Sequence, residues 1–89
     1  MSRQRSLEKI LASQYISIGE LSRITGYRYS TLKFYTEEGI LPFEQAEENL
    51  TRRFLQTQAI QRLEEIQALR GKGKTMAEIK QHFLGNNFQ

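Results

Sequence analysis

The stretch GYRYSTLKFYTEEGILP (residues 26–42) holds four aromatic rings within nine residues and places Arg28 and Lys33 among them. A core helix buries its aromatic residues and does not intersperse them with cations. We predict a helix over about residues 29–38, ended by Gly39, with successive side chains about 100° apart. The side expected to face the core carries Leu32, Tyr35, Thr31 and Thr36. The opposite side is polar and aromatic, and it carries Tyr29, Ser30, Lys33 and Phe34.

The residues before this stretch predict another helix, which ends at its first glycine. Within residues 15–26, Ser17 and Glu20 form an S-x-x-E capping box, which satisfies two backbone N–H groups at a helix start. Ile16 and Leu21 occupy the two positions of a hydrophobic staple. Two helices joined by a short turn that contains glycine make a helix-turn-helix. Many small helical domains share this pattern, so it is not specific by itself.

The flanking segments predict a short helix in front and an extended segment behind. Residues 6–14 have Ser6 as a candidate N-cap, followed by apolar positions at helical spacing, Leu7, Ile10 and Leu11. We expect this helix to cover the core; an added contact surface is the alternative. Pro42 disfavours helix in residues 40–55, for which we predict a short β-hairpin, or wing, around an acidic loop.

Two further helices are predicted after the wing. Residues 57–72 place their apolar side chains on one broad face, namely Ala59, Ile60, Leu63, Ile66 and Leu69. The side chains predicted to lie outside that face include Gln61, Arg62 and Glu65. Thr75 and Glu78 form a second capping box, and the helix after it should bury Met76, Ile79 and Phe83.

The order of these motifs resembles the DNA-binding domain of MerR-family transcription regulators. The resemblance covers residues 16 to about 83, and the matching positions are IGEL (18–21), TG (25–26), TLKFY (31–35), GILP (39–42), Arg52, Phe54, Leu63, Ile66, LR (69–70), Gly73, Thr75 and EI (78–79). It implies a mainly α fold, a winged helix-turn-helix with a small β-hairpin wing and a C-terminal helix pair that acts as a second wing. We expect an N-terminal basic, amphipathic helix over 1–14, the winged domain over 15–84 and a flexible tail over 85–89.

Several positions depart from the family pattern. Arg28 stands where the family has Ser or a similar cap, Lys33 replaces its usual Arg, and Phe34 replaces its first Tyr. The wing reads LTRRF (50–54) in place of G-Y-R-x-Y, and its loop carries Glu44, Glu47 and Glu48. The chain ends where members carry a long dimerisation helix and an effector domain. We therefore expect either an excised DNA-binding domain or a short member that assembles side by side on repeated sites.

The resemblance implies binding to duplex DNA, with the helix over about 29–38 in the major groove and the wings on flanking backbone. The predicted DNA-binding residues are Ser17, Arg28, Tyr29, Ser30, Lys33, Phe34, Arg52, Arg53, Lys72 and Lys74. Tyr29 and Phe34 have packing under the wing as an alternative, and Lys72 and Lys74 also suit a helix C-terminus. We expect Tyr27, in the turn, to belong to the core.

The individual roles follow from side-chain chemistry. We expect Lys33 to reach a phosphate or a guanine edge, and Phe34 to contact a thymine methyl group or a sugar. Arg28, near the helix start, pairs with a phosphate or a base. Arg52 and Arg53 fall on opposite faces of the wing's return strand, so we expect one of them, Arg52, to hold a phosphate.

Composition limits the class of protein. The 89 residues predict one small domain with a net charge of +3, and they include no cysteine, which excludes disulfides and thiolate metal sites. There is no apolar run of membrane-spanning length, and we expect a cytoplasmic, nucleoid-associated protein. The single histidine, His82, is interpreted as a surface residue.

No catalytic constellation, cofactor motif or metal cluster is visible in the sequence, so we predict a protein that is not an enzyme and needs no cofactor. The predicted partners are double-stranded DNA and further copies of the chain, which self-associate on DNA or through residues outside this chain. No membrane or small molecule is expected. A protein–protein interaction module on the same fold, or a small excisionase- or partition-type DNA architectural factor, are the alternatives.

Overall fold

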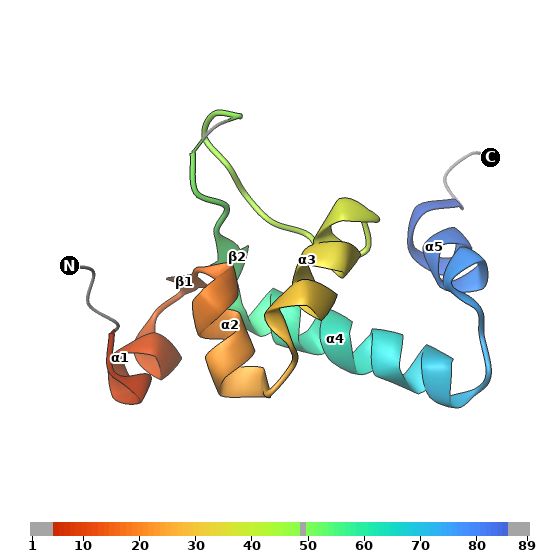
Figure 1. Cartoon of the computed structure of the whole chain (residues 1–89), viewed down its shortest axis with the longest axis horizontal. Coiled ribbons are helices and arrows are strands. Elements are labelled where there is room, and N and C mark those ends of the chain that lie inside the picture. Colours follow the sequence, from red (N-terminus) through yellow and green to blue (C-terminus); the bar gives the residue numbers. More distant parts are fainter. Residues whose placement is uncertain (1–4, 49, 86–89) are drawn as a thin grey trace.

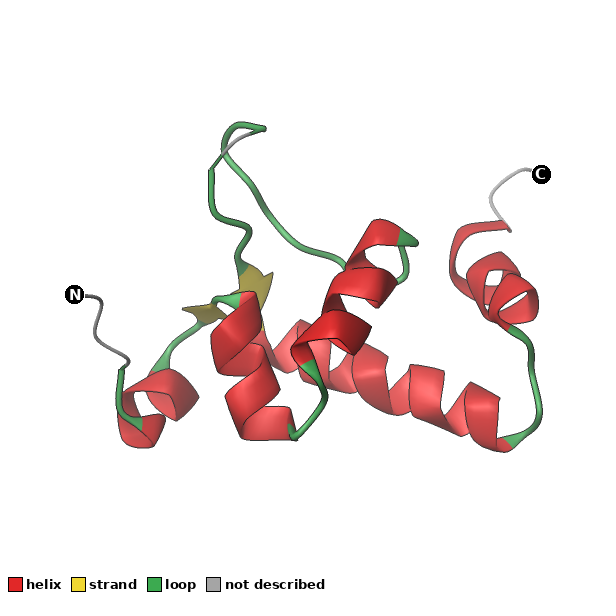
Figure 2. Cartoon of the chain, in the orientation of Figure 1, coloured by secondary structure: helices red, strands yellow, loops and turns green. Residues whose placement is uncertain are grey.

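The computed structural model describes residues 5–48 and 50–85, within which it has five helices and two short strands. In chain order these are α1 (Leu7–Ala12), β1 (Tyr15–Ile16), α2 (Ile18–Thr25), α3 (Tyr29–Glu37), β2 (Phe54–Leu55), α4 (Gln56–Gly71) and α5 (Met76–Leu84), shown in Figures 1 and 2. The mainly α winged helix-turn-helix is confirmed. The predicted tail over 85–89 lies outside the described residues except for Gly85, and so do residues 1–4 of the predicted N-terminal segment.

The helix-turn-helix consists of α2 and α3, which pack against each other. The predicted capping box of α2 is confirmed: Ser17 Oγ accepts from the Glu20 backbone N at 3.2 Å, and the Glu20 carboxylate accepts from the Ser17 backbone N at 3.0 Å. At the end of α2, Gly26 has φ of 80°, a conformation that glycine adopts at little cost. Helix α3 starts after Arg28, whose side chain makes no capping hydrogen bond, as the sequence predicted.

The small sheet forms between distant parts of the chain rather than within the wing. β1 runs antiparallel to β2 in the register Tyr15–Leu55 and Ile16–Phe54. Among the described residues, the two arms of the wing share one bridge, Glu44–Arg53, directly before β2. The prediction of a β-hairpin within residues 40–55 is therefore wrong in its strand pairing, since β2 pairs with β1 and not with the other arm of the wing. The physical reason is burial, because pairing β1 with β2 places Ile16 and Phe54 side by side in the core, at 2% and 0% exposure.

The core gathers apolar side chains from every helix and from both strands. Its buried members include Ile10, Leu21, Leu32, Tyr35, Ile40, Leu41, Leu63, Ile66 and Ile79. Helix α1 contributes Ile10 alone, while Leu7 and Leu11 are exposed, so the prediction that α1 covers the core holds for one of its three apolar residues. The second capping box is confirmed, with Thr75 as the N-cap of α5 and Glu78 closing it.

Candidate nucleic-acid interface

The two faces of α3 are as different as the sequence predicted. Leu32, Tyr35 and Thr36 are buried. The opposite face exposes Ser30 and Lys33 together with two aromatic rings, Tyr29 at 55% and Phe34 at 44% exposure. Since Tyr29 and Phe34 remain largely accessible, they are not covered by the wing. Figure 1 shows α3 between the wing and α5, with α2 beside it and α4 running below it in this view.

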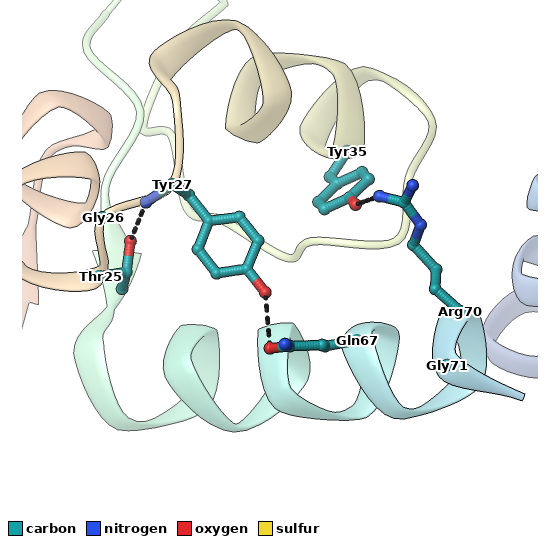
Figure 3. Close-up of a pocket in the computed structure, with 7 residues that line it drawn as sticks. All are labelled: Thr25, Gly26, Tyr27, Tyr35, Gln67, Arg70 and Gly71. Carbon is teal, nitrogen blue, oxygen red and sulfur yellow. Dashed lines mark hydrogen bonds between the residues drawn. The ribbon is translucent and has the colours of Figure 1, made fainter.

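Tyr27 packs against the core from the turn between α2 and α3, as predicted. Its hydroxyl lies 3.4 Å from Gln67 Oε1 and 3.5 Å from the carbonyl oxygen of Leu63, both on α4 (Figure 3). Burial raises the pKa of the Tyr27 hydroxyl above its ordinary value, with smaller effects from neighbouring charged groups. The ring therefore anchors the turn to α4 and does not belong to the exposed face of α3.

Arg28 and Ser17 occupy the N-cap positions of α3 and α2, but only one of them acts as a cap. Arg28 is exposed and leaves the first backbone N–H groups of α3 without a side-chain partner. The Ser17 oxygen, in contrast, already accepts from the Glu20 backbone N–H. Helix starts favour anions because of the helix dipole, so the start of α3 suits a negatively charged partner.

The wing presents its two arginines differently. The Arg52 guanidinium lies 4.8 Å from the centre of the Phe43 ring, and that ring is 6.1 Å from the ring of buried Phe54. Arg52 is half-buried, and its guanidinium stacks on the Phe43 ring, which restricts the orientation of the side chain. Arg53 is exposed, and its backbone pairs with that of Glu44.

The acidic residues of the wing loop do not neutralise these arginines. Among the described residues, neither arginine has a carboxylate within 4.0 Å. Glu44 instead accepts a hydrogen bond from the Tyr15 hydroxyl at 3.2 Å, a contact that raises the pKa of that hydroxyl. Glu47 and Glu48 are exposed near the loop tip. The carboxylates of this loop therefore do not pair with Arg52 or Arg53.

Lys72 and Lys74 flank Gly73 in the turn between α4 and α5, and both are exposed. Gly73 has φ of 85°, which allows the chain to reverse there. Lys72 is also the C-cap residue of α4, so a favourable interaction with the helix dipole applies to it in any case. Of the ten predicted DNA-binding residues, the described structure exposes Arg28, Tyr29, Ser30, Lys33, Phe34, Arg53, Lys72 and Lys74, and it half-buries Ser17 and Arg52.

Three polar residues have structural roles that sequence reasoning missed. Gln56 is 9% exposed, and its amide donates to the backbone carbonyl groups of Ile10 and Ser13 at 3.0 and 2.6 Å, which ties α1 to the start of α4. Arg62, predicted to lie outside the apolar face of its helix, turns inward and donates to the Ile40 carbonyl at 2.7 Å. Its predicted place on the outer face is therefore wrong, because its long apolar stem can pack while its head finds a carbonyl group.

The third of these residues is Arg5. Its guanidinium donates to both carboxylate oxygens of Glu20, at 2.7 and 2.8 Å, and so joins the segment before α1 to the capping box of α2. This pairing, helped by the Ser17 backbone N–H, lowers the pKa of Glu20 to about 2. No sequence signal marked the pair, because its members are far apart in the chain.

The sequence matches the family model described as MerR HTH family regulatory protein over residues 16–85. The chain belongs to this family. Its description confirms the coarse prediction of a helix-turn-helix protein that binds DNA and regulates transcription. No curated protein and no solved structure shows a match to the chain. That this member of the MerR family is not an enzyme stays a prediction.

Other kinds of site find little support in the part of the chain that the structure describes. Within residues 5–48 and 50–85, no three His, Asp or Glu side chains gather as a metal site. His82 is exposed, with its ring edge-on to Phe83 at 4.8 Å. In the same ranges, no helix combines the length and the apolar character needed to cross a bilayer.

Proposed function

We propose that this MerR-family chain regulates transcription by binding a specific double-stranded DNA sequence with α3 in the major groove. The exposed face of α3 reads base edges through Lys33, while Tyr29 and Ser30 hydrogen-bond to phosphates or bases and Phe34 contacts a thymine methyl group or a sugar. Arg28 holds a phosphate or a base at the start of the helix. Residues 15–84 form the DNA-binding unit, and α1 is an accessory helix attached to it.

The observation that carries this proposal is the exposed face of α3 with cations on both sides of it. Two large aromatic rings and a lysine are presented on a helix whose other face is firmly buried. Figure 1 shows the wing segment, which carries Arg52 and Arg53, on one side of α3 and the α4–α5 turn, which carries Lys72 and Lys74, on the other. Among the described residues, Lys33, Arg53, Lys72 and Lys74 make no ion pair. A surface of this pattern suits a polyanion that is wider than α3 itself.

A salt titration tests the proposal. The dissociation constant for a fluorescent random duplex, and for a site selected from a random pool, is measured by anisotropy at several salt concentrations. Logarithmic affinity should fall linearly with logarithmic salt, with a slope of about 0.9 for each phosphate contacted. Absence of binding to both duplexes at low salt would refute the proposal.

A pair of lysine variants locates the interface. Lys33→Ala removes the proposed contact to a base edge, so affinity for the selected site should fall and its preference over the random duplex should decrease. Lys9→Ala removes an exposed cation from α1, which lies at the left end of the molecule in Figure 1, beyond α2 from α3, and serves as the matched control. Equal effects of the two variants would contradict the placement of α3 on DNA.

The wing arginines allow a sharper comparison. Arg52 is held on Phe43 and Arg53 is not, so Arg52→Ala should weaken binding more than Arg53→Ala. A protein–protein interaction module is the second candidate function, and the exposed pair Glu47 and Glu48 with the half-exposed Leu50 favours it. In that case the charge-reversing change Glu48→Lys would affect partner binding, and Lys33→Ala would not.

Assembly is proposed to occur on DNA, with copies side by side. Light scattering of the chain with and without a duplex that carries one or two selected sites measures the number of copies bound. A second copy that binds more tightly than the first supports self-association on DNA, and independent binding contradicts it. Strong bending of the duplex, measured by energy transfer between its ends, would instead favour the architectural-factor alternative.

A further inference from the structure

The helices of this domain pack as two pairs, α2 with α3 and α4 with α5, which share the apolar core. Three hydrogen bonds or ion pairs with a cationic donor join the pairs in the described residues. Arg70 donates to the Tyr35 hydroxyl at 3.0 Å, Arg62 to the Ile40 carbonyl at 2.7 Å, and Lys80 lies 2.9 Å from the Glu38 carboxylate. Each donor belongs to α4 or α5, and each acceptor belongs to α3 or to the turn that follows it. We call these contacts the three cationic links.

The link between Arg70 and Tyr35 reaches into the recognition helix itself. Tyr35 is 2% exposed, so its ring is fixed in the core and the position of its hydroxyl oxygen is fixed with it. Figure 3 shows the Arg70 guanidinium extending from the end of α4 to that hydroxyl. Tyr27 lines the same pocket, but its hydroxyl makes only long contacts, at 3.4 and 3.5 Å. The two tyrosines therefore form a natural pair of test and control.

The link through Arg62 joins three parts of the fold. Its guanidinium lies 4.1 Å from the centre of the Phe83 ring on α5, while it donates to the Ile40 carbonyl after α3. Glu65, one turn along α4, lies 3.5 Å from it. A stacked and hydrogen-bonded guanidinium keeps its orientation better than a lysine would at the same place.

The three links have a consequence for the proposed DNA contacts. Lys33 lies two residues before Tyr35, and Lys72 and Lys74 lie two and four residues after Arg70. We infer that Arg62, Arg70 and Lys80 are positioning residues, which hold Lys72 and Lys74 at a fixed distance from the reading face of α3. They act through this geometry and not through phosphate contact. The inference rests on the proposed function for its DNA part, but the geometry is testable without DNA.

The DNA-free experiment uses the lack of cysteine in the chain. Spin labels are attached after Glu37→Cys on α3 and Ala77→Cys on α5, both exposed positions, and the distribution of distances between them is measured by pulsed electron resonance. Tyr35→Phe should broaden the distribution, and adding Arg62→Met, which keeps the apolar stem over Phe83, should broaden it further. Tyr27→Phe should leave it unchanged. A distribution in the double variant as narrow as that of the parent would overturn the inference.

In the presence of DNA, the measured quantity is the slope of logarithmic affinity against logarithmic salt concentration. A variant that is only less stable should not change this slope. Tyr35→Phe removes no charge, yet it should lower the slope by up to about two, because Lys72 and Lys74 no longer reach their phosphates together. The combined change Lys72→Ala and Lys74→Ala should then cost little more in that background. An unchanged slope with an undiminished effect of the two lysine changes would overturn the inference. If the parent chain binds no DNA, the proposed function fails, and the spin-label distances alone decide the positioning role.

Discussion

Helices α2 and α3 are consecutive and nearly equal in length, with eight and nine residues, but they begin in opposite ways. The start of α2 is closed by a capping box, and Arg5 reinforces that box from outside the helix. The start of α3 has an exposed arginine at the N-cap position and no side-chain cap. The helix that supports the fold is capped locally, and the helix proposed to meet DNA is left open at the end where an anion would bind.

The difference between the two helix starts shows where α2 and α3 each obtain their stability. A capped helix keeps part of its stability from its own sequence, whereas an uncapped helix of nine residues depends on the face that it buries. In α3 that face is formed by Leu32, Tyr35 and Thr36. The exposed face is thereby free to carry residues selected for contact and not for helix formation.

The largest effect is expected from the buried face of α3. Leu32→Ala removes a side chain at 0% exposure and should lower the free energy of unfolding by about 3 kcal/mol, because it leaves a cavity under a helix with no local support. The neighbouring change Lys33→Ala should leave stability nearly unchanged. Urea unfolding followed by circular dichroism measures both. Equal stability of the two variants would contradict the dependence of α3 on burial.

The capping box of α2 should have the next largest effect. Ser17→Ala removes the oxygen that accepts from the Glu20 backbone N–H, and stability should fall by about 1 kcal/mol. Ser30→Ala, in the exposed first turn of α3, is the control and should change stability by less than half as much. A thermal melt of each variant without DNA is sufficient. If Ser30→Ala is the more damaging change, the contrast between the two helix starts is wrong.

A smaller effect of opposite sign is expected at the open helix start. Arg28→Ser supplies the missing N-cap and should raise the free energy of unfolding by about 0.5 to 1 kcal/mol. The same change removes a proposed phosphate contact, so affinity for duplex DNA should fall. Unfolding and anisotropy measurements on one preparation test both signs. A variant that is more stable and binds equally well would exclude Arg28 from the interface.

The smallest effect should appear as a pH dependence. The pKa of Glu20 is lowered from 4.5 to about 2, mainly by Arg5, so its ionised form stabilises the folded state above pH 4.5. That contribution is lost as the pH falls from 4.5 towards 2. The stability difference between the parent and Glu20→Gln should therefore be present at pH 7 and shrink across this range. Glu48→Gln, a change of the same kind at an exposed position in the wing, is the matched control.

Local signals in the sequence predicted much of the fold. The two capping boxes, the missing cap at Arg28 and the division of α3 into two faces each depend on residues within four positions, and all were found in the structure. The partner of β2 was not predicted, because Tyr15 and Leu55 are far apart in the sequence, with the whole helix-turn-helix between them.

The site was less predictable for a related reason. Sequence periodicity assigns polar residues to the surface, and so it could not show that Gln56 is buried or that Arg62 points inward. Nor could it show that Arg5 pairs with Glu20, which is far from it in the sequence. Only the tertiary contacts show which cations stabilise the fold and which face outward. The proposed interface consists of cations of the second kind.

The burial of Gln56 limits which amino acids position 56 can accept. Its amide supplies N–H donors to carbonyl groups of Ile10 and Ser13, from a site that is 9% exposed. Glutamate would bring acceptors against acceptors, asparagine is one methylene shorter, and leucine would leave buried carbonyl groups without donors. In a library randomised at this position and sorted for folded protein, glutamine should dominate. Libraries randomised at the exposed positions Gln58 and Gln61 of the same helix should retain many different polar residues.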